Sequence, residues 1–130
     1  MADPGNVGTL LRTADAFGAA VALSPECADP LGPRALRASA GAIFRVPRCE
    51  WCETPHPRVA LVAHGGWSLR EANLAPPVTF VLGAEREGLP QELVAASDQE
   101  VTIGLPGSAE SLNVAAAGAI ALYELSRGGS

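Results

Sequence analysis

The sequence contains no lysine, so all nine of its cationic side chains are arginines. This absence excludes two function classes, because a P-loop needs a lysine to reach the phosphates and Schiff-base catalysis needs a lysine amine. The glycine-containing segment GAEREGLP at 83–90 is therefore not a P-loop. The formal net charge of −5 also argues against non-specific binding to nucleic acid, which requires a basic surface. Any nucleic acid must meet a local cluster of arginines.

One such cluster is available in the sequence. Arg34, Arg37, Arg45 and Arg48 lie within fifteen consecutive residues. They are candidates for contacts with RNA phosphates, and the alternative is that they are scattered charges that keep the protein in solution.

Cysteine is also scarce. Three cysteines, an odd number, do not form a disulfide framework, and a chain without a signal peptide is expected to keep its thiols reduced. Cys49 and Cys52 form a CxxC pair with His56 four residues further on, but the remaining candidates, Cys27 and His64, have no second paired spacing. A zinc site needs four ligands, so no metal site is predicted.

Long hydrophobic runs are missing as well. Each apolar stretch is interrupted well before the ~20 residues that would span a bilayer, and no basic segment precedes an apolar one at Met1. We therefore expect no membrane contact and a cytoplasmic protein. A length of 130 residues with 48% hydrophobic residues favours one domain, residues 1–130.

The sequence alternates between strand and helix patterns. Short apolar runs predict the strands, and apolar residues at helical spacing predict the helices, the first of which starts at Asn6 as its N-cap and stops at Gly18. The expected strands are 19–23, 42–46, 59–63, 78–82 and 100–103, and the expected helices are 6–18, 34–39, 90–96 and 112–125. This order predicts an α/β fold with a parallel sheet, helices on both faces, and ligands beyond the C-terminal strand ends.

Two features depart from a regular doubly wound domain. No strand precedes the first helix, which begins five residues into the chain. The strands expected at 42–46 and 59–63 are too close in sequence for a crossover helix, so we do not expect them to be neighbours in the sheet.

The stretch 103–125 joins a strand to an apolar helix through a polar turn. Its glycines and Pro106 prevent the strand from continuing, and Ser111 and Asn113 flank Leu112 just before the helix. Helix N-termini bind polar ligands, so a binding site is predicted here. Five alanines between 115 and 121 would let this helix pack closely on several sides.

Three segments together resemble the SpoU (TrmH) family of RNA ribose 2′-O-methyltransferases, within the SPOUT superfamily. They are DPGNVGTLLRTADAFG at 3–18, FVLGAEREGLP at 80–90 and IGLPGSAESLNVAAAGAIALYE at 103–124, and RALRASAGAIFRVP at 34–47 also fits. The resemblance covers most of the chain, with the three motifs in the right order.

The resemblance implies a C-terminal deep trefoil knot, a homodimer, and S-adenosylmethionine held by backbone of the second and third motifs. It places the cofactor contacts at six positions: Leu82, Gly83, Gly88, Ile103, Leu105 and Leu112. It also implies an RNA substrate, tRNA or rRNA, for which the arginine cluster supplies Arg34, Arg37 and Arg45. Compared with the family, the chain lacks the usual first strand and an N-terminal RNA-binding extension.

The catalytic residues that the resemblance implies are Asn6, Arg12, Glu85, Ser111 and Asn113. Arg12 would contact the target ribose and its phosphate. Since a guanidinium does not normally lose a proton, Arg12 is expected to orient the 2′-hydroxyl and stabilise the developing alkoxide. The other four would hold substrate, cofactor or the motif loops, and the alternative for each is a cap or turn residue.

Two other functions remain open from the sequence. One is a catalytically silent knotted dimer that binds S-adenosylmethionine or RNA without turnover. The other is a small-molecule enzyme or nucleotide-binding domain that uses the 83–88 loop.

Overall fold

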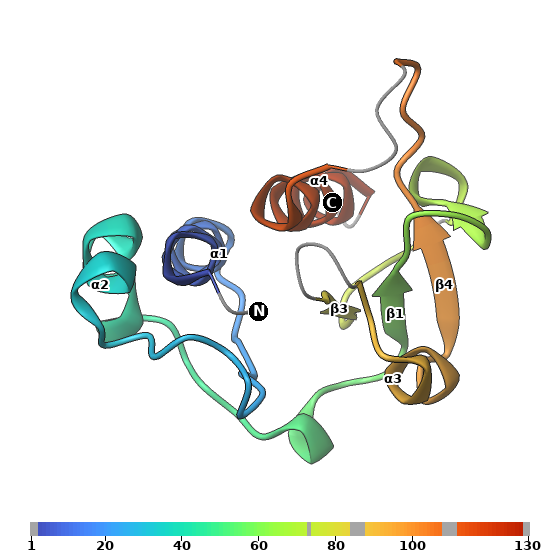
Figure 1. Cartoon of the computed structure of the whole chain (residues 1–130). Helices are drawn as coiled ribbons and strands as arrows, with labels where there is room; N and C mark the ends of the chain where they lie inside the picture. The colour runs from blue at the N-terminus through green and yellow to red at the C-terminus, as the bar shows by residue number, and fades with distance from the viewer. Residues whose placement is uncertain (1–2, 73, 84–87, 108–111, 129–130) are drawn as a thin grey trace. The chain divides into compact units, whose positions relative to one another are not determined.

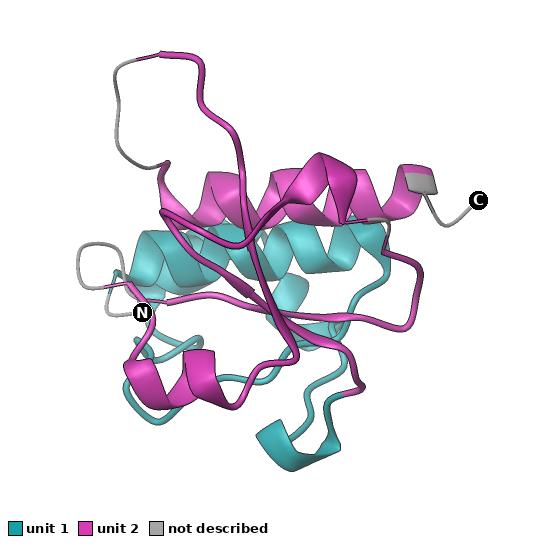
Figure 2. Cartoon of the chain, turned by 90° about the vertical axis from the view of Figure 1, so that its right-hand side faces the viewer, with its two compact units in different colours: residues 1–54 teal, residues 55–130 magenta. Residues whose placement is uncertain are grey.

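The chain divides after Thr54 into two units, residues 1–54 and 55–130 (Figure 2). The structure is a computed structural model that describes residues 3–72, 74–83, 88–107 and 112–128. Glu85 and Ser111, two of the predicted catalytic residues, lie outside this described part.

The first unit begins with helix α1 (Pro4–Phe17), which the sequence predicted with a different start. Asp3 is the N-cap, and its Oδ1 accepts hydrogen bonds from the backbone N–H groups of Gly5 (2.7 Å) and Asn6 (3.3 Å). The prediction that Asn6 is the cap was wrong, because a proline fits the first helical position and moves the helix start upstream. Gly18 ends the helix in the left-handed conformation with φ of 68°, as predicted.

Helix α1 packs closely against helix α2 (Pro33–Ser39), and Figure 1 shows the two side by side. A Cβ atom at Gly8 would lie only 2.4 Å from the carbonyl oxygen of Ala35, so only glycine allows this approach. The buried face of α1 forms one side of a small core. That core consists of Val7, Leu11, Ala14, Ala42, Ile43 and Val46.

The strand predicted at 42–46 is instead the 3₁₀ helix η1 (Ala42–Phe44). Ala40 and Gly41 precede it with φ of 51° and 81°, which turns the chain sharply after α2. Side chains 42, 43 and 46 are buried, which is a helical spacing and not the alternation of a strand.

The strand predicted at 19–23 was also wrong as a full strand. It is reduced to a single parallel bridge between Val21 and Arg48. Val21 N–H donates to the carbonyl of Pro47 and its own carbonyl accepts from Cys49, each at 2.9 Å. Pro47 has no N–H to extend the ladder. The unit ends with the 3₁₀ helix η2 (Trp51–Glu53).

The second unit contains the parallel sheet that the sequence predicted. Its strands are β1 (Arg58–Leu61), β2 (Trp67–Ser68), β3 (Thr79–Val81) and β4 (Gln99–Thr102), in the order β2-β4-β1-β3. All three pairings are parallel. The strands predicted at 59–63, 78–82 and 100–103 are confirmed within a residue or two, whereas β2 falls in a segment predicted to be a loop.

The position of β4 is unusual for its place in the chain. β1 and β2 are separated in sequence only by residues 62–66, yet β4 lies between them and pairs with both. Val62 N–H donates to the carbonyl of Val101 at 2.9 Å, so the connection 62–66 leaves β1 in contact with β4. Gly66 then approaches the β4 backbone closely enough that a Cβ would lie 2.4 Å from the carbonyl oxygen of Glu100.

Helices complete the second unit. The 3₁₀ helix η3 (Leu69–Glu71) follows β2, α3 (Gln91–Ala95) precedes β4, and α4 (Val114–Gly128) follows it. Ala121 of α4 is fully buried against the sheet in a cluster with Val59, Leu69 and Val101. In the described part of the chain, no helix is both long and apolar enough to cross a membrane.

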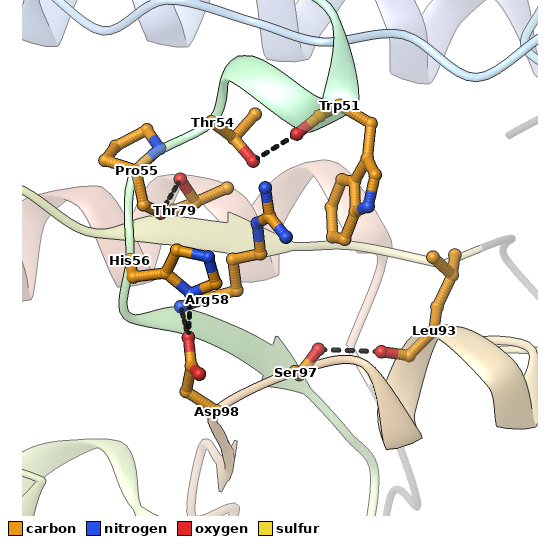
Figure 3. Close-up of polar contacts among 9 residues, drawn as sticks. All are labelled: Trp51, Thr54, Pro55, His56, Arg58, Thr79, Leu93, Ser97 and Asp98. Carbon is orange, nitrogen blue, oxygen red and sulfur yellow. Dashed lines mark hydrogen bonds and ion pairs between the residues drawn. The ribbon is translucent and has the colours of Figure 1, made fainter.

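The N-terminal ends of β1 and β4 are joined by the carboxylate of Asp98. Its Oδ2 accepts from the backbone N–H of Arg58 at 2.6 Å and lies 2.7 Å from Nδ1 of His56 (Figure 3). These two hydrogen bonds lower the pKa of Asp98 below its ordinary 3.8. The bond from the Arg58 N–H has the larger effect on this pKa and the bond with His56 the smaller. The polar pair therefore lies at the edge opposite the predicted ligand site.

Candidate cofactor-binding edge

The two motif loops of the second unit begin at the same edge of the sheet. β3 and β4 flank β1 and run parallel to it, so their C-terminal ends meet at one edge. Leu82 and Gly83 follow the end of β3, and Ile103 follows the end of β4. Leu105 lies two residues after Ile103. Four of the six predicted cofactor positions therefore follow strand ends at this edge, which is where ligands bind in parallel sheets.

The loop after β3 closes on itself through two glycines. A Cβ atom at Gly83 would lie 2.3 Å from the carbonyl carbon of Gly88 and 2.5 Å from the nitrogen of Leu89. Gly88 has φ of 68°, a left-handed conformation that favours glycine. The backbone entering the loop thus touches the backbone leaving it. Glu85 belongs to the part between them, outside the described residues.

The segment after β4 is only partly buried. Ile103 packs against the core cluster of the second unit, and Leu105 is half-buried. Gly104, Pro106 and Gly107 are exposed. Among the described residues, no atom lies within 4 Å of a Cβ built at Gly104 or Gly107.

Asn113 is the N-cap of α4. Its side-chain Oδ1 accepts from the backbone N–H groups of Ala115 at 2.9 Å and Ala116 at 3.2 Å. This is the cap role that the sequence left open for this residue, and it commits the amide oxygen to the helix. Leu112, immediately before it, is half-buried. A role of Asn113 toward a substrate, which would use the amide N–H₂ group, stays a prediction.

The first unit carries the predicted catalytic arginine. Arg12 is exposed, as are Thr9 and Ala16 of the same helix. It lies one helical turn after Gly8, the residue at which α1 approaches the α2 backbone closely. Asn6 lies in the first turn of the same helix and is half-buried.

The predicted RNA-binding arginines also belong to the first unit. Arg34 and Arg37 lie on the exposed face of α2, three residues apart. Arg45 is half-exposed, and its guanidinium binds the Asp15 carboxylate, with Nε and Nη2 each 2.9 Å from Oδ2. Arg45 is therefore tied to α1, and part of its charge is offset by Asp15.

Sequence reasoning missed three features of these units. The pairing of His56 with Asp98 joins residues 42 positions apart and left no local signal. The exposed Trp67 lies on β2, a strand too short to show a pattern. Phe44 was assigned to an apolar strand, although the glycine at 41 was a signal for a turn before it.

No group of three or more histidine, cysteine or acidic side chains gathers as a possible metal site among the residues that the structure describes. The three cysteines form no disulfide.

Known proteins match nearly the whole chain. The SpoU rRNA Methylase family model matches residues 1–123. An uncharacterized tRNA/rRNA methyltransferase of Synechocystis is 35% identical over 96% of this chain, and a 23S rRNA uridine-2′-O-methyltransferase of Streptomyces viridochromogenes is 32% identical over 95%. Among solved structures, an rRNA methyltransferase of Sinorhizobium meliloti bound to AdoMet has a TM-score of 0.87 and 34% identity, covering 96% of this chain and 52% of its own.

The chain covers only part of the length of these relatives. The chain spans about half the length of the curated relatives it matches, 50% of the Synechocystis protein and 49% of the Streptomyces protein.

Proposed function

The chain belongs to the SpoU rRNA Methylase family, and from this premise we propose that it transfers a methyl group from S-adenosylmethionine to a ribose 2′-hydroxyl of tRNA or rRNA. The observation that carries the proposal is the contact of Gly83 with Gly88 at the end of β3. This turn belongs to the segment FVLGAEREGLP, and the family match over this segment supports a cofactor loop there. A turn this tight brings main-chain groups together in a way that side chains would prevent.

The residues at this edge fit an adenosine-sized ligand. Main-chain groups after the ends of β3 and β4 are no longer committed to the sheet, so residues 82–83, 88 and 103–105 can hold it by backbone hydrogen bonds. Leu112 and the half-buried Leu105 supply apolar contact for a purine ring. When bound, S-adenosylmethionine supplies the electrophilic methyl group.

Arg12 acts on the other substrate in this proposal. Its guanidinium binds the ribose and the adjacent phosphate, positions the 2′-oxygen, and stabilises the negative charge that develops on it. Positioning of two substrates can contribute ~7 kcal/mol or more to such a transfer. Asn6 and Glu85 fix the motif loops, and Ser111 and Asn113 add hydrogen bonds to substrate or cofactor.

A second copy of the chain completes the site. Ala116, Ile120 and Tyr123 lie along one exposed face of α4 at helical spacing, and Ile120 and Tyr123 are 40% and 56% exposed. An apolar stripe of this kind is suited to a helix-to-helix interface. In the dimer, Arg12 of one copy serves the cofactor loops of the other.

A C-terminal knot and helices on both faces of the sheet are also part of the proposal. β4 lies between β1 and β2, two strands that are joined by residues 62–66, and this strand order supports a knotted path of the chain. We expect the following segment up to α4 to complete a trefoil knot, with helices on both faces of the full sheet. We expect the protein to act in the cytoplasm, where RNA is modified.

Calorimetry and methyl transfer test this function in sequence. Titration with S-adenosylmethionine should show binding, and Gly83→Ala should weaken this binding at least tenfold. Incubation with tritiated S-adenosylmethionine and unmodified RNA should then label the RNA. Binding without transfer would favour a silent binder, and a failure to bind the cofactor would overturn the proposal.

A further inference from the structure

Phe44 is the most exposed large hydrophobic side chain of the described residues, with 75% of its surface accessible. Three residues of the same turn are buried. Ala42, Ile43 and Val46 are at most 8% exposed and belong to the core of the first unit. The 3₁₀ turn therefore directs these three side chains inward and leaves the aromatic ring of Phe44 in solvent.

The backbone around Phe44 is fixed. Phe44 N–H donates to Gly41 at 3.1 Å, and the N–H groups of Arg45 and Val46 both donate to the carbonyl of Ala42 at 2.9 Å. An exposed ring on a rigid backbone loses little conformational freedom when it stacks on a ligand.

The sequence segment that carries this ring is basic, although Asp15 of α1 pairs with one of its arginines, Arg45. Residues 30–49 contain four arginines and no acidic residue, so this segment carries +4 in a chain whose net charge is −5. Arg45 follows Phe44 directly, and its guanidinium is held above the turn by Asp15. Arg48 is exposed, and the bridge to Val21 pins its backbone.

We propose that Phe44 stacks on an unpaired nucleobase of the RNA while Arg48 contacts the neighbouring phosphate. The proposal rests on the proposed function, because it takes RNA as the partner. Aromatic rings beside arginines are suited to single-stranded RNA, since every base has a face to stack on and every phosphate is negative. If the partner were a protein instead of RNA, its surface would be expected to offer acidic groups to these arginines. Phe44 would then lie in the interface between the two proteins.

Binding of fluorescein-labelled, unmodified tRNA and rRNA fragments, measured by anisotropy without cofactor, tests the proposal. Phe44→Ala should weaken binding roughly 5- to 150-fold, the range for loss of one stacked base. It should not change the salt dependence, because no charge is removed, whereas Arg48→Ala should reduce the slope against log salt by roughly 0.7–0.9. Phe44→Trp should retain its affinity for RNA. The new tryptophan adds fluorescence to that of the wild type, and RNA binding should quench this added signal.

Two controls separate stacking from other causes. Phe17→Ala removes a 39%-exposed phenylalanine outside the arginine segment and should leave RNA affinity unchanged. The thermal midpoint and the S-adenosylmethionine affinity of Phe44→Ala should match wild type.

Three results would each overturn the inference. They are unchanged RNA affinity in Phe44→Ala, no RNA binding by the wild type, and a shift of Phe44→Ala to a smaller oligomer. RNA binding that depends on Phe44 without any methyl transfer would instead overturn the proposed reaction alone.

Discussion

Gly66 lies against the backbone of Glu100, where a Cβ atom on Gly66 would fall 2.4 Å from the carbonyl oxygen and 2.7 Å from the carbonyl carbon of Glu100. The contact joins the start of β2 to the strand that separates β2 from β1. It is therefore the point at which a short connection passes close to a strand from much later in the chain. No side chain fits between the two backbones.

Gly66→Ala should destabilise the second unit. The methyl group would collide with rigid backbone, and overpacking of this kind costs about 1–3 kcal/mol. Gly65→Ala is the matched control, because Gly65 also has positive φ (84°, against 70° at Gly66) but no atom of the described residues lies within 4 Å of its Cβ position. Both variants bear the backbone strain, and only Gly66→Ala bears the collision. Equal unfolding free energies in urea would contradict the contact.

Gly83→Ala should weaken S-adenosylmethionine binding at least tenfold while the protein stays folded. The added methyl would separate Gly83 from Gly88 and open the turn that we propose holds the cofactor. Calorimetry measures the affinity and circular dichroism checks the fold. Wild-type affinity in a folded Gly83→Ala protein would show that this turn does not bind the cofactor.

Arg12→Ala should reduce methyl transfer by about a hundredfold or more, the scale for loss of one group that stabilises developing charge. Affinity for S-adenosylmethionine should stay within a few-fold, because Arg12 is assigned to the ribose. Arg70→Ala, an exposed arginine of the second unit, is the control and should transfer normally. Single-turnover rates and calorimetry separate the two effects. Loss of cofactor binding in Arg12→Ala would mean that its role is misassigned.

Asn113 allows its structural and chemical roles to be separated. Asn113→Ala should lower stability by about 1 kcal/mol through loss of the α4 cap, whereas Asn113→Asp keeps an acceptor for Ala115 and Ala116 and should stay near wild type. Asp lacks the amide N–H₂ group that a substrate contact would need. Full methyl transfer by the stable Asn113→Asp variant would therefore restrict Asn113 to capping.

Asp98 should make stability depend on acid pH. Its pKa in the folded protein is lowered below 3.8 by the Arg58 N–H and by His56, so its contribution is present above the unfolded pKa and is lost as pH falls through the lowered value. Asp98→Asn should lower the thermal midpoint at pH 7, and the difference from wild type should shrink below about pH 4. Glu26→Gln, at an exposed loop position, is the control. A difference that is constant across pH would contradict the assignment.

The sheet was largely predictable because its strands are short apolar runs bounded by glycine, proline or charge. The runs at 59–63, 78–82 and 100–103 gave correct strands, and their parallel direction, predicted from the alternation of strands and helices along the chain, is confirmed. The similar run at 42–46 failed, since a short apolar run does not distinguish strand from helix. In that case the left-handed turn at Ala40 and Gly41 decided the outcome.

The place of the two motif loops in the fold was predictable, but their contacts were not. Loops after parallel strands open at one edge, which placed Gly83 and Ile103 correctly at strand ends. The touching of Gly83 and Gly88, the insertion of β4, and the exposure of Phe44 depend on packing between distant residues, which no local pattern records.

The most direct measurement is nucleoside mass spectrometry of unmodified tRNA and rRNA incubated with the protein and isotope-labelled S-adenosylmethionine. The account predicts labelled nucleosides in which the methyl group is on the ribose 2′-oxygen, and none with Arg12→Ala. A labelled methyl group on a base, or RNA that stays unlabelled although the cofactor binds, would contradict it.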